Sequence, residues 1–463
     1  MAYILVIVVY AVAQVALGAW IARRVRGAGD FFVAGRALGP GVLAATLLAA
    51  NIGGGSTVGA AGAGFRNGLA AWWWVGSAAI GSAVLAMAFG PRLRRIAAAH
   101  DLRTVGDFLE WRYDQRVRAV VAVLLWAGAV FILAGQLLAM AAVLGTIAGL
   151  GRITSCAIGA IVATTYFAAG GLKSSVAVNV LQLGVKLLGF AVAVPLALAA
   201  VGGLAGLHQA LPSGPYWSVW RNGGSGWIYV ATLAPAFVVS PGILQKVYAG
   251  RDDRAVRIGV GLNALVLLLF APVPPMLGMI ARALHPGLAA SDNALPLLFA
   301  ADLPFAVGAL GLAAIFSAEV SAADALLFML ATSFSQDIYR RFVNRAAGDA
   351  DLVWWARAAA VAGSVMAFVL ATAVARDVID ALSVFYMLLG VSLFVPIVAG
   401  LVSGRGDGAA ALCAVAGGVA TAAGVQWHSG SGPVHALTPP MWGIAVAAIA
   451  YMIAAAVMPR RIA

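Results

Sequence analysis

Residues 49–57 read Ala-Ala-Asn-Ile-Gly-Gly-Gly-Ser-Thr, inside an apolar stretch long enough to cross a bilayer. Each glycine costs a helix about 1 kcal/mol relative to alanine, so three in a row disfavour a continuous helix there. An unwound segment would free backbone amides and carbonyls to line a cavity, and Ser56 and Thr57 would add hydroxyl groups. Glycines also let helices pack closely, but a contiguous triplet beside Asn51 and two hydroxyl residues favours a break in the helix.

The whole chain shares this apolar character. Hydrophobic residues make up 63% of it and charged residues 10%, a composition outside the range of soluble domains. A helix needs about 20 apolar residues to cross a bilayer, and apolar runs without period-two alternation exclude a barrel. The sequence therefore predicts an all-α integral membrane protein with about thirteen spans, at 3–22, 41–65, 70–90, 117–150, 153–169, 175–201, 227–248, 258–281, 305–339, 354–375, 378–401, 409–425 and 440–457.

A second broken helix is predicted in the seventh span. It contains Ala234-Pro235 and then Val239-Ser240-Pro241-Gly242, and each proline removes a backbone donor and clashes with the preceding turn. Membrane helices also tolerate proline without breaking. The second and seventh spans would cross in opposite directions, which places both breaks at equivalent positions of two inverted five-helix repeats.

This symmetry predicts a single transmembrane domain over 1–463. It would comprise an extra first helix and loop (1–36), two repeats (41–201 and 227–402) and two C-terminal helices (409–463).

The net charge of +12 is explained by topology rather than by a nucleic-acid partner. With the N-terminus outside and the C-terminus inside, most basic residues face the cytoplasm, as the positive-inside rule requires. The lipid bilayer of the inner membrane is thus the expected partner. The inner set includes Arg23, Arg24, Arg26, Arg36, Arg92, Arg94, Arg95, Arg103, Arg112, Arg116, Arg118, Lys246, Arg251, Arg254, Arg257, Arg340, Arg341, Arg345, Arg460 and Arg461, and the outer set is Arg66, Arg152, Arg221, Arg282 and Arg376.

Catalytic and cofactor motifs are lacking from the sequence. The histidines fall in predicted loops or helix ends without HExxH or GxSxG context, so we expect no enzyme. No P-loop is present, and Cys156 and Cys413 lie in distant spans without metal-ligand or disulfide spacing. We expect no organic cofactor. A channel would need a continuous polar path, whereas the chain offers isolated polar points and a paired break, the pattern of alternating access.

Few charged residues fall inside the predicted spans away from their ends: Lys186 in the sixth, and Glu319 and Asp324 in the ninth. Because a charge at the bilayer centre is costly, each is a candidate functional group. Asp324 either has a structural role, paired with Lys186 or hydrogen-bonded to hydroxyls of neighbouring helices, or takes part in ion coupling. At 100° per residue, Glu319 points away from the face that carries Ala314, Ser317, Ala318, Ser321 and Asp324.

Several further motifs accompany the glycine triplet, in a fixed order. They are Asp-Phe-Phe-Val-Ala-Gly-Arg (30–36), Arg-Asn-Gly-Leu-Ala (66–70), Tyr166 with Gly-Gly-Leu-Lys (170–173) and Gln182, Gln245-Lys246, Ala-Ala-Ile-Phe-Ser (313–317) and Ser-Gln-Asp-Ile-Tyr (335–339). In these motifs and their spacing, nearly the whole chain resembles the sodium:solute symporter family. The resemblance implies the leucine-transporter-type fold and ion-coupled symport of a small solute.

The resemblance also implies a sodium site between the second and ninth helices. Its ligands would be the backbone carbonyls of Ala49, Ile52 and Ala314 and the hydroxyl of Ser317, hard oxygens of the kind that suit a small cation. The chain departs from the family pattern at Ala318, where a second hydroxyl residue is usual, and at Asn179, where an aspartate is common.

Lys186 lies two turns beyond Asn179 on the same helix face, where its ammonium would stand in for sodium. The ion-coupling candidates are therefore Asn179, Lys186, Ser321 and Asp324. Sodium is the coupling ion that the family favours. The alternatives are proton coupling through Lys186 or Asp324, and an uncoupled facilitator or channel.

The solute is expected between the two breaks. The amides of broken helices favour a carboxylate, and the middle of the seventh helix is poor in side-chain hydrogen-bonding groups, which disfavours a hexose. An organic acid or amino acid is the resulting prediction. The expected contact residues are Gly53, Gly54, Gly55, Ser56, Thr57, Trp73, Gln136, Ala236, Ser240 and Tyr386, and Trp72, Trp74 and Phe385 are further aromatic candidates.

Overall fold

The computed structural model describes residues 2–22, 36–220, 228–429, 434 and 437–457. Within these residues the regular secondary structure is helical, and the β contacts are two isolated bridges, Leu38 with Gly250 and Val434 with Leu437. The predicted all-α class is confirmed. The motif at 30–35 and the topology residues Arg23, Arg24, Arg26, Arg221, Arg460 and Arg461 lie outside the described residues, as do the side chains of Tyr166 and 170–173.

The first half of the chain supplies α1 (Ala2–Ala22), α3 (Pro40–Asn51), η2 (Gly55–Gly59), α4 (Ala60–Asn67), η3 (Gly68–Ala71), α5 (Trp72–Val84), η4 (Leu85–Phe89), α6 (Gly90–Ala99), α7 (Val105–Arg112), α8 (Gln115–Ala148), α9 (Arg152–Ala200), α10 (Gly203–Ala210) and η5 (Pro215–Trp217).

The second half supplies α11 (Ile228–Val239), α12 (Pro241–Tyr248), α13 (Asp253–Phe270), α14 (Val273–Leu284), η6 (Ser291–Asn293), α15 (Ala294–Leu297), η7 (Leu298–Asp302), α16 (Phe305–Thr332), η8 (Ser333–Val343), α17 (Asp349–Ala373), α18 (Val378–Leu389), η9 (Gly390–Phe394), α19 (Val395–Val402), α20 (Gly408–Ser429) and α21 (Pro439–Val457).

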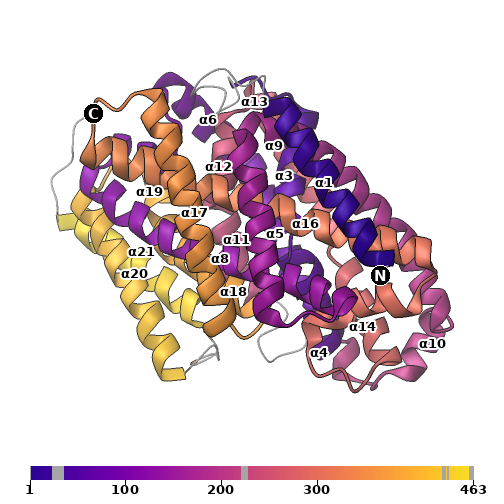
Figure 1. The fold of residues 1–463 in the computed structure, drawn as a ribbon. Coiled ribbons are helices and arrows are strands. Elements are labelled where there is room, and N and C mark those ends of the chain that lie inside the picture. Colours follow the sequence, from indigo (N-terminus) through magenta and orange to yellow (C-terminus); the bar gives the residue numbers. More distant parts are fainter. Residues whose placement is uncertain (1, 23–35, 221–227, 430–433, 435–436, 458–463) are drawn as a thin grey trace.

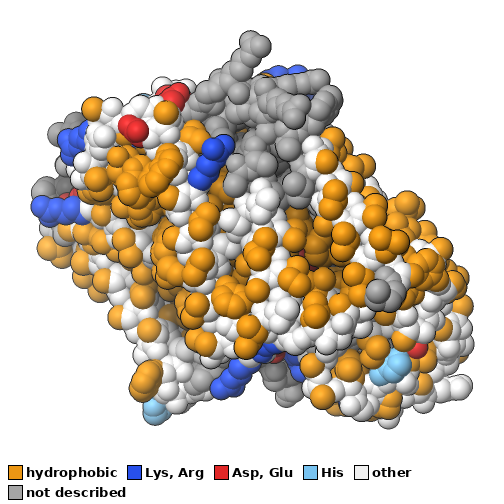
Figure 2. Space-filling model, in the orientation of Figure 1, with side chains coloured by type: hydrophobic (Ala, Val, Ile, Leu, Met, Phe, Trp, Pro, Cys, Tyr) orange, Lys and Arg blue, Asp and Glu red, His pale blue; other side chains and the backbone are white. Residues whose placement is uncertain are grey.

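Ten helical stretches among the described residues are long and apolar enough to cross a membrane. Three shorter apolar helices, Ala2–Gln14, Pro40–Asn51 and Arg152–Thr165, accompany them. Figure 2 shows hydrophobic side chains over the middle of one face, with charged side chains toward its two ends. The membrane character is thus confirmed, whereas the number of thirteen spans, the inverted repeats and the placement of the termini stay predictions.

One expected connection is absent. The predicted spans 153–169 and 175–201 form a single backbone helix, α9. The intervening stretch contains glycine but no proline. Glycine weakens a helix without forbidding it, whereas proline removes a donor and blocks the preceding turn.

Both predicted breaks are present. Helix α3 ends at Asn51, Ile52 leaves the helical region with φ −90° and ψ 83°, and the π-helical turn η2 begins at Gly55. Helix α11 ends at Val239, Ser240 has φ −55° and ψ 123°, and Pro241 opens α12. Pro235 lies inside α11 without ending it, so the second of the two proline sites makes the break.

The broken helices lie in the middle of the bundle. Helix α16 packs against α9 and α8, α3 packs against α13 and α9, and α11 packs against α5. Figure 1 shows α1 at one side of the molecule and the paired helices α20 and α21 at the opposite side. The two breaks are therefore enclosed by protein rather than by lipid, as interrupted backbone at membrane depth requires.

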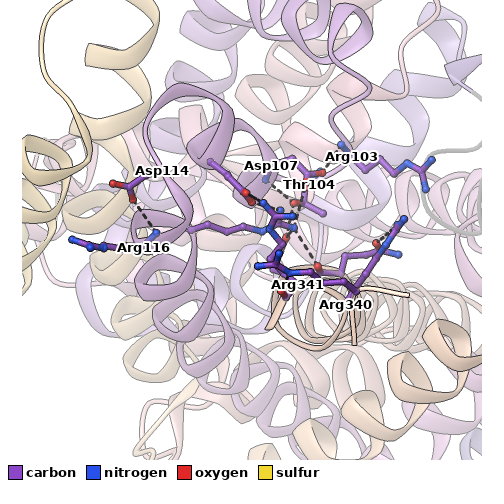
Figure 3. A network of polar contacts seen from close by, with 12 residues as sticks. Arg103, Thr104, Asp107, Asp114, Arg116, Arg340 and Arg341 are labelled. Carbon is purple, nitrogen blue, oxygen red and sulfur yellow. Dashed lines mark hydrogen bonds and ion pairs between the residues drawn. The ribbon is translucent and has the colours of Figure 1, made fainter. Parts of the chain in front are cut away.

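A buried ionic network fixes one end of the bundle (Figure 3). The guanidinium of Arg118 on α8 pairs with Asp107 and Glu110 of α7 at 2.9 and 2.8 Å, and with Asp337 of η8 at 2.6 Å. Thr104 caps α7 and donates its hydroxyl to Asp337 at 2.7 Å. Because Arg118 has only 7% of its side chain exposed, these contacts hold the end of α16 and η8 against α8.

Candidate solute and ion site

The first break redirects the backbone hydrogen bonds of α3. In a continuous helix the amides of Gly53 and Gly54 would donate to the carbonyls of Ala49 and Ala50. Instead the Gly53 amide donates to the Ser56 hydroxyl at 2.9 Å, and the Gly54 amide donates to Oε1 of Gln136 at 2.7 Å. The carbonyl at Ala49 is thereby freed for another donor.

That donor is the side chain of Lys186. Its fully buried ammonium donates to the carbonyl oxygens of Ala49 at 2.7 Å and Ile52 at 3.0 Å, and to the hydroxyl of Ser321 at 2.5 Å. Ser321 also donates toward the Ala49 carbonyl at 2.8 Å. Helices α3, α9 and α16 therefore meet at a cluster of oxygens that holds one positive charge.

The opposite side of the break meets a carboxylate. The Thr57 hydroxyl lies 2.9 Å from the carbonyl of Gly53 and 3.0 Å from Oε1 of Glu319, which is fully buried. Glu319 thus approaches the break from a different side of α16 than Ser321. The helical periodicity had predicted this separation.

The residues expected to bind sodium are brought together only in part. Ala49 and Ile52 direct their carbonyls to one point, and Ser321 of α16 completes the cluster there. Ala314 lies about two turns before Ser321 on α16, and its side chain faces Gly189 of α9. Ser317 faces Tyr10 of α1. The other ion-coupling candidates, Asn179 of α9 and Asp324 of α16, are both buried.

A cavity of about 100 Å³ lies between the two breaks. It is small beside the roughly 300–1,000 Å³ of pockets that hold drug-sized ligands. Residues from both broken helices and from α8, α16 and α18 line it, and the predicted contact residues among them are Gly53, Gly55, Ser56, Gln136, Ser240 and Tyr386.

The other predicted contact residues lie outside this lining. Gly54, Thr57 and Ala236 are buried beside it. Trp73 turns toward the loop before α11, where its indole donates to the carbonyl of Val219 at 2.9 Å and its ring lies 4.9 Å from that of Trp220.

The aromatic wall of the cavity includes three of the aromatic candidates, Trp74, Phe385 and Tyr386. Trp74 rather than Trp73 faces inward, and its ring lies 5.3 Å from Tyr229 and 5.9 Å from Tyr386. The ring of Phe237 lies 5.5 Å from that of Tyr386. Three consecutive tryptophans carry no signal of which one faces the cavity, because each step turns the helix by 100°.

Lys246 was also missed as a cavity residue. It follows the second break on α12, lines the cavity and donates from Nζ to the carbonyl of Thr46 on α3 at 2.9 Å. The sequence had singled out Lys246 only within a family motif and among the basic residues expected on the cytoplasmic side. Its position gives an otherwise largely apolar chamber a positive group.

Beyond the first break, α4 leads to an acidic cluster at the loop end of the bundle. Arg66 contacts Ser291 and lies 3.6 Å from Asp377, while Asp292 of η6 accepts the Val378 amide at 3.0 Å. Burial raises the pKa of Asp292 to about 6, and the charge of Asp377 adds to the shift, against the opposing effects of the Val378 amide and Arg66.

Comparison with known proteins adds to this geometry. The family model described as the sodium:solute symporter family matches residues 31–418. The chain belongs to the sodium:solute symporter family. This member is therefore a membrane transporter and not an enzyme, as its sequence predicted.

Curated relatives are distant but cover most of the chain. The sodium/glucose cotransporter of Vibrio parahaemolyticus is 26% identical over 80% of this chain and 74% of its own length. The sodium/pantothenate symporter of Escherichia coli is 28% identical over 67% of this chain and 66% of its own length.

A solved structure shares the fold of this family member. A Na+-coupled sialic acid symporter, in a substrate-bound outward-open state, superposes with a TM-score of 0.84. It is 16% identical and the match covers 99% of this chain and 98% of the other. The expected leucine-transporter-type fold is thereby confirmed.

Proposed function

We propose that the protein is a secondary active transporter that carries a small solute through the cavity between its two broken helices, driven by an ion gradient. The observation that carries this proposal is the shared lining of that cavity. Gly53 and Gly55 come from the first break and Ser240 comes from the second, so one chamber touches both. A site between interrupted helices is the arrangement by which such transporters hold their cargo during alternating access.

The cavity chemistry supports an amphipathic solute with a carboxylate. Trp74, Phe237, Phe385 and Tyr386 offer an apolar wall for the body of the molecule. The ammonium of Lys246 offers a charge partner for an anionic group, since a carboxylate gains most from a charge-assisted hydrogen bond. An organic acid or an amino acid fits this combination better than a hexose, which would need more hydrogen-bonding side chains.

The named substrates of the relatives do not identify the solute of this protein. Proteins of nearly equal identity to this chain are named for glucose and for pantothenate. Pantothenate carries a carboxylate and glucose does not. The proposal of a carboxylate therefore depends on Lys246 and on the small number of hydrogen-bonding side chains around the cavity.

A sodium gradient across the inner membrane is the driving force that the family relation supports. Protons are the second candidate, because the Lys186 ammonium lies among the oxygens where a coupling cation is expected. Asp324 is a second buried group on the same path. A facilitator without ion coupling is the remaining alternative.

Two experiments test this function in sequence. A thermal-shift screen of the purified protein against amino acids, organic acids, vitamins and sugars identifies the solute, because a ligand of the folded state raises its melting temperature. Uptake of that solute into proteoliposomes is then measured under a sodium gradient at constant pH, under a pH gradient without sodium, and with neither. Accumulation against a gradient supports secondary active transport, and flux that never saturates with solute concentration contradicts it.

A further inference from the structure

Lys186 uses every hydrogen-bond donor that it has. An ammonium carries three N–H groups, and three acceptors surround this one: the carbonyls of Ala49 and Ile52 and the hydroxyl of Ser321. None of the three is a carboxylate. A buried charge is normally held by an opposite charge, so a cage of neutral oxygens around Lys186 indicates a site built for a cation.

The cage exists because α3 is broken. The Ile52 carbonyl would accept from the Ser56 amide in a continuous helix, but that amide donates to Gly53 at 3.0 Å. The Ala49 carbonyl loses its partner in the same way, since the Gly53 amide donates to the Ser56 hydroxyl. Two carbonyl oxygens therefore point into one space, and hard oxygens of this kind are the ligands of small metal cations.

A sodium ion does not fit beside the ammonium. Sodium would need the same carbonyl oxygens that already lie 2.7 and 3.0 Å from Nζ. It would also lie within a few ångströms of a positive charge at a fully buried position, where repulsion is strong. The charged neighbours of the ammonium are Glu319 of α16 and a second cation, Lys246 of α12.

We propose that Lys186 is a tethered cation that occupies the ion position between α3, α9 and α16, so that this position neither binds nor requires sodium. The inference rests on the proposed function, because it concerns the ion site of the same transporter. It departs from what the family relation supports. The chain carries its own cation on α9 in place of one drawn from solution.

Thermal unfolding of the full-length protein in sodium chloride and in choline chloride tests this proposal, at constant ionic strength and pH. The wild-type melting temperature is expected to be the same in both salts. Lys186→Ala removes the ammonium from the cage, so the Ile52 carbonyl loses its donor and the Ala49 carbonyl keeps only the Ser321 hydroxyl. This variant is expected to melt lower in choline chloride, and its melting temperature should then rise with the logarithm of sodium concentration, as ligand binding requires.

Lys246→Ala is the matched control. It also removes a buried ammonium that donates to a carbonyl of α3, that of Thr46 at 2.9 Å, but it leaves Lys186 in place. It should lose stability and remain indifferent to sodium. A sodium response in both variants would overturn the proposal, because the response would then not belong to the cage.

Other outcomes decide the question as clearly. Stabilisation of the wild-type protein by sodium would overturn the proposal, and this measurement stands even if Lys186→Ala does not fold. A folded Lys186→Ala protein that ignores sodium would also overturn it, because the cage would then not be a cation site. These titrations involve no solute, so a failure to observe transport would reject the proposed function and leave the sodium result intact.

Discussion

The two helix breaks differ in what surrounds them. The break after α3 is crowded and polar: Lys186, Gln136 and the Ser56 hydroxyl saturate its backbone. The break between α11 and α12 spans one residue, Ser240, whose carbonyl accepts from the next turn of α12. It is bordered by the aromatic side of the cavity. In the proposed transporter, the first break therefore forms the cation position, and both breaks border the space for the solute.

This difference shows that glycine and proline interrupt a helix at different energetic cost, because they leave different numbers of backbone groups without a helical partner. Glycines remove the helix preference over several residues, so many backbone groups need outside partners. A proline at the start of α12 removes only one donor, which a first turn would leave unpaired anyway. The glycine break accordingly recruits side chains from α8, α9 and α16, and the proline break recruits few.

The largest expected effect is the loss of stability when a side chain is added at the crowded first break, compared with the same change at the second break. A Cβ at Gly54 would lie 2.5 Å from Oε2 of Glu319 and 2.7 Å from Cβ of Ala139. Gly54→Ala should therefore lose about 1–3 kcal/mol of stability through overpacking. A Cβ at Gly242, at the second break, would meet nothing within 4 Å. Gly242→Ala should stay within about 0.5 kcal/mol of wild type. Unfolding midpoints in detergent measure both, and equal losses would contradict the contrast.

A second substitution removes a partner of the first break. Gln136→Leu leaves the Gly54 amide without the acceptor that lies 2.7 Å away, which should cost about 1–3 kcal/mol. Gln136 also lines the cavity, so solute binding should weaken with it.

Gln182→Leu is the control for that experiment. Gln182 is a buried glutamine that donates to Gln14 at 2.9 Å, between α9 and α1. Its replacement should reduce stability and leave solute affinity unchanged in a binding titration. An equal loss of affinity in both variants would show that Gln136 acts only through stability.

The third test concerns Lys246, the cavity residue beside the second break that is proposed to bind the carboxylate of the solute. Lys246→Met keeps the length of the side chain and removes its charge, so carboxylate solutes found in the thermal-shift screen should bind about 10-fold more weakly, or about 1.4 kcal/mol. The amide of the same solute is the control and should lose little affinity. If both forms weaken alike, Lys246 does not contact the carboxylate.

The smallest expected effect tests the anchoring of α4 beyond the first break. The pKa of Asp292 is about 6 in the folded protein against 3.8 for a free side chain. The folded state therefore binds the proton more tightly, and stability should fall as pH rises from about 4 to 6, by an amount on the order of 1 kcal/mol. Asp292→Asn should flatten this slope in melting curves taken across that window.

Asp101 provides a control of opposite sign. Burial acts to raise its pKa, but Arg36 and Arg103 together hold it below the usual value. Its contribution to stability is present above its unfolded pKa and is lost as pH falls through the folded one. Asp101→Asn should therefore leave the decline between pH 4 and 6 in place. A flattened decline in this variant would contradict the assignment to Asp292.

Local chemistry made the breaks predictable. Glycine and proline act on the backbone within a turn of their own position, so Gly53 and Pro241 marked both interruptions without knowledge of any neighbour. Pro235 was the exception, since α11 continues through it. Side-chain direction was less predictable, because 100° of helix rotation separates Trp73, which turns toward the loop before α11, from Trp74, which lines the cavity.

The sequence alone determined that this protein is a helical membrane protein with two interrupted helices and a lysine inside an apolar span, because hydropathy and backbone propensity are properties of each segment. The tertiary structure decided which residues contact the interrupted helices and the buried lysine. Only the packing of α3 against α9 and α16 brings Lys186 to the freed carbonyls, and only the closeness of α8 supplies Gln136 to Gly54. Contacts between distant segments depend on helix rotation and tilt, which no single segment encodes.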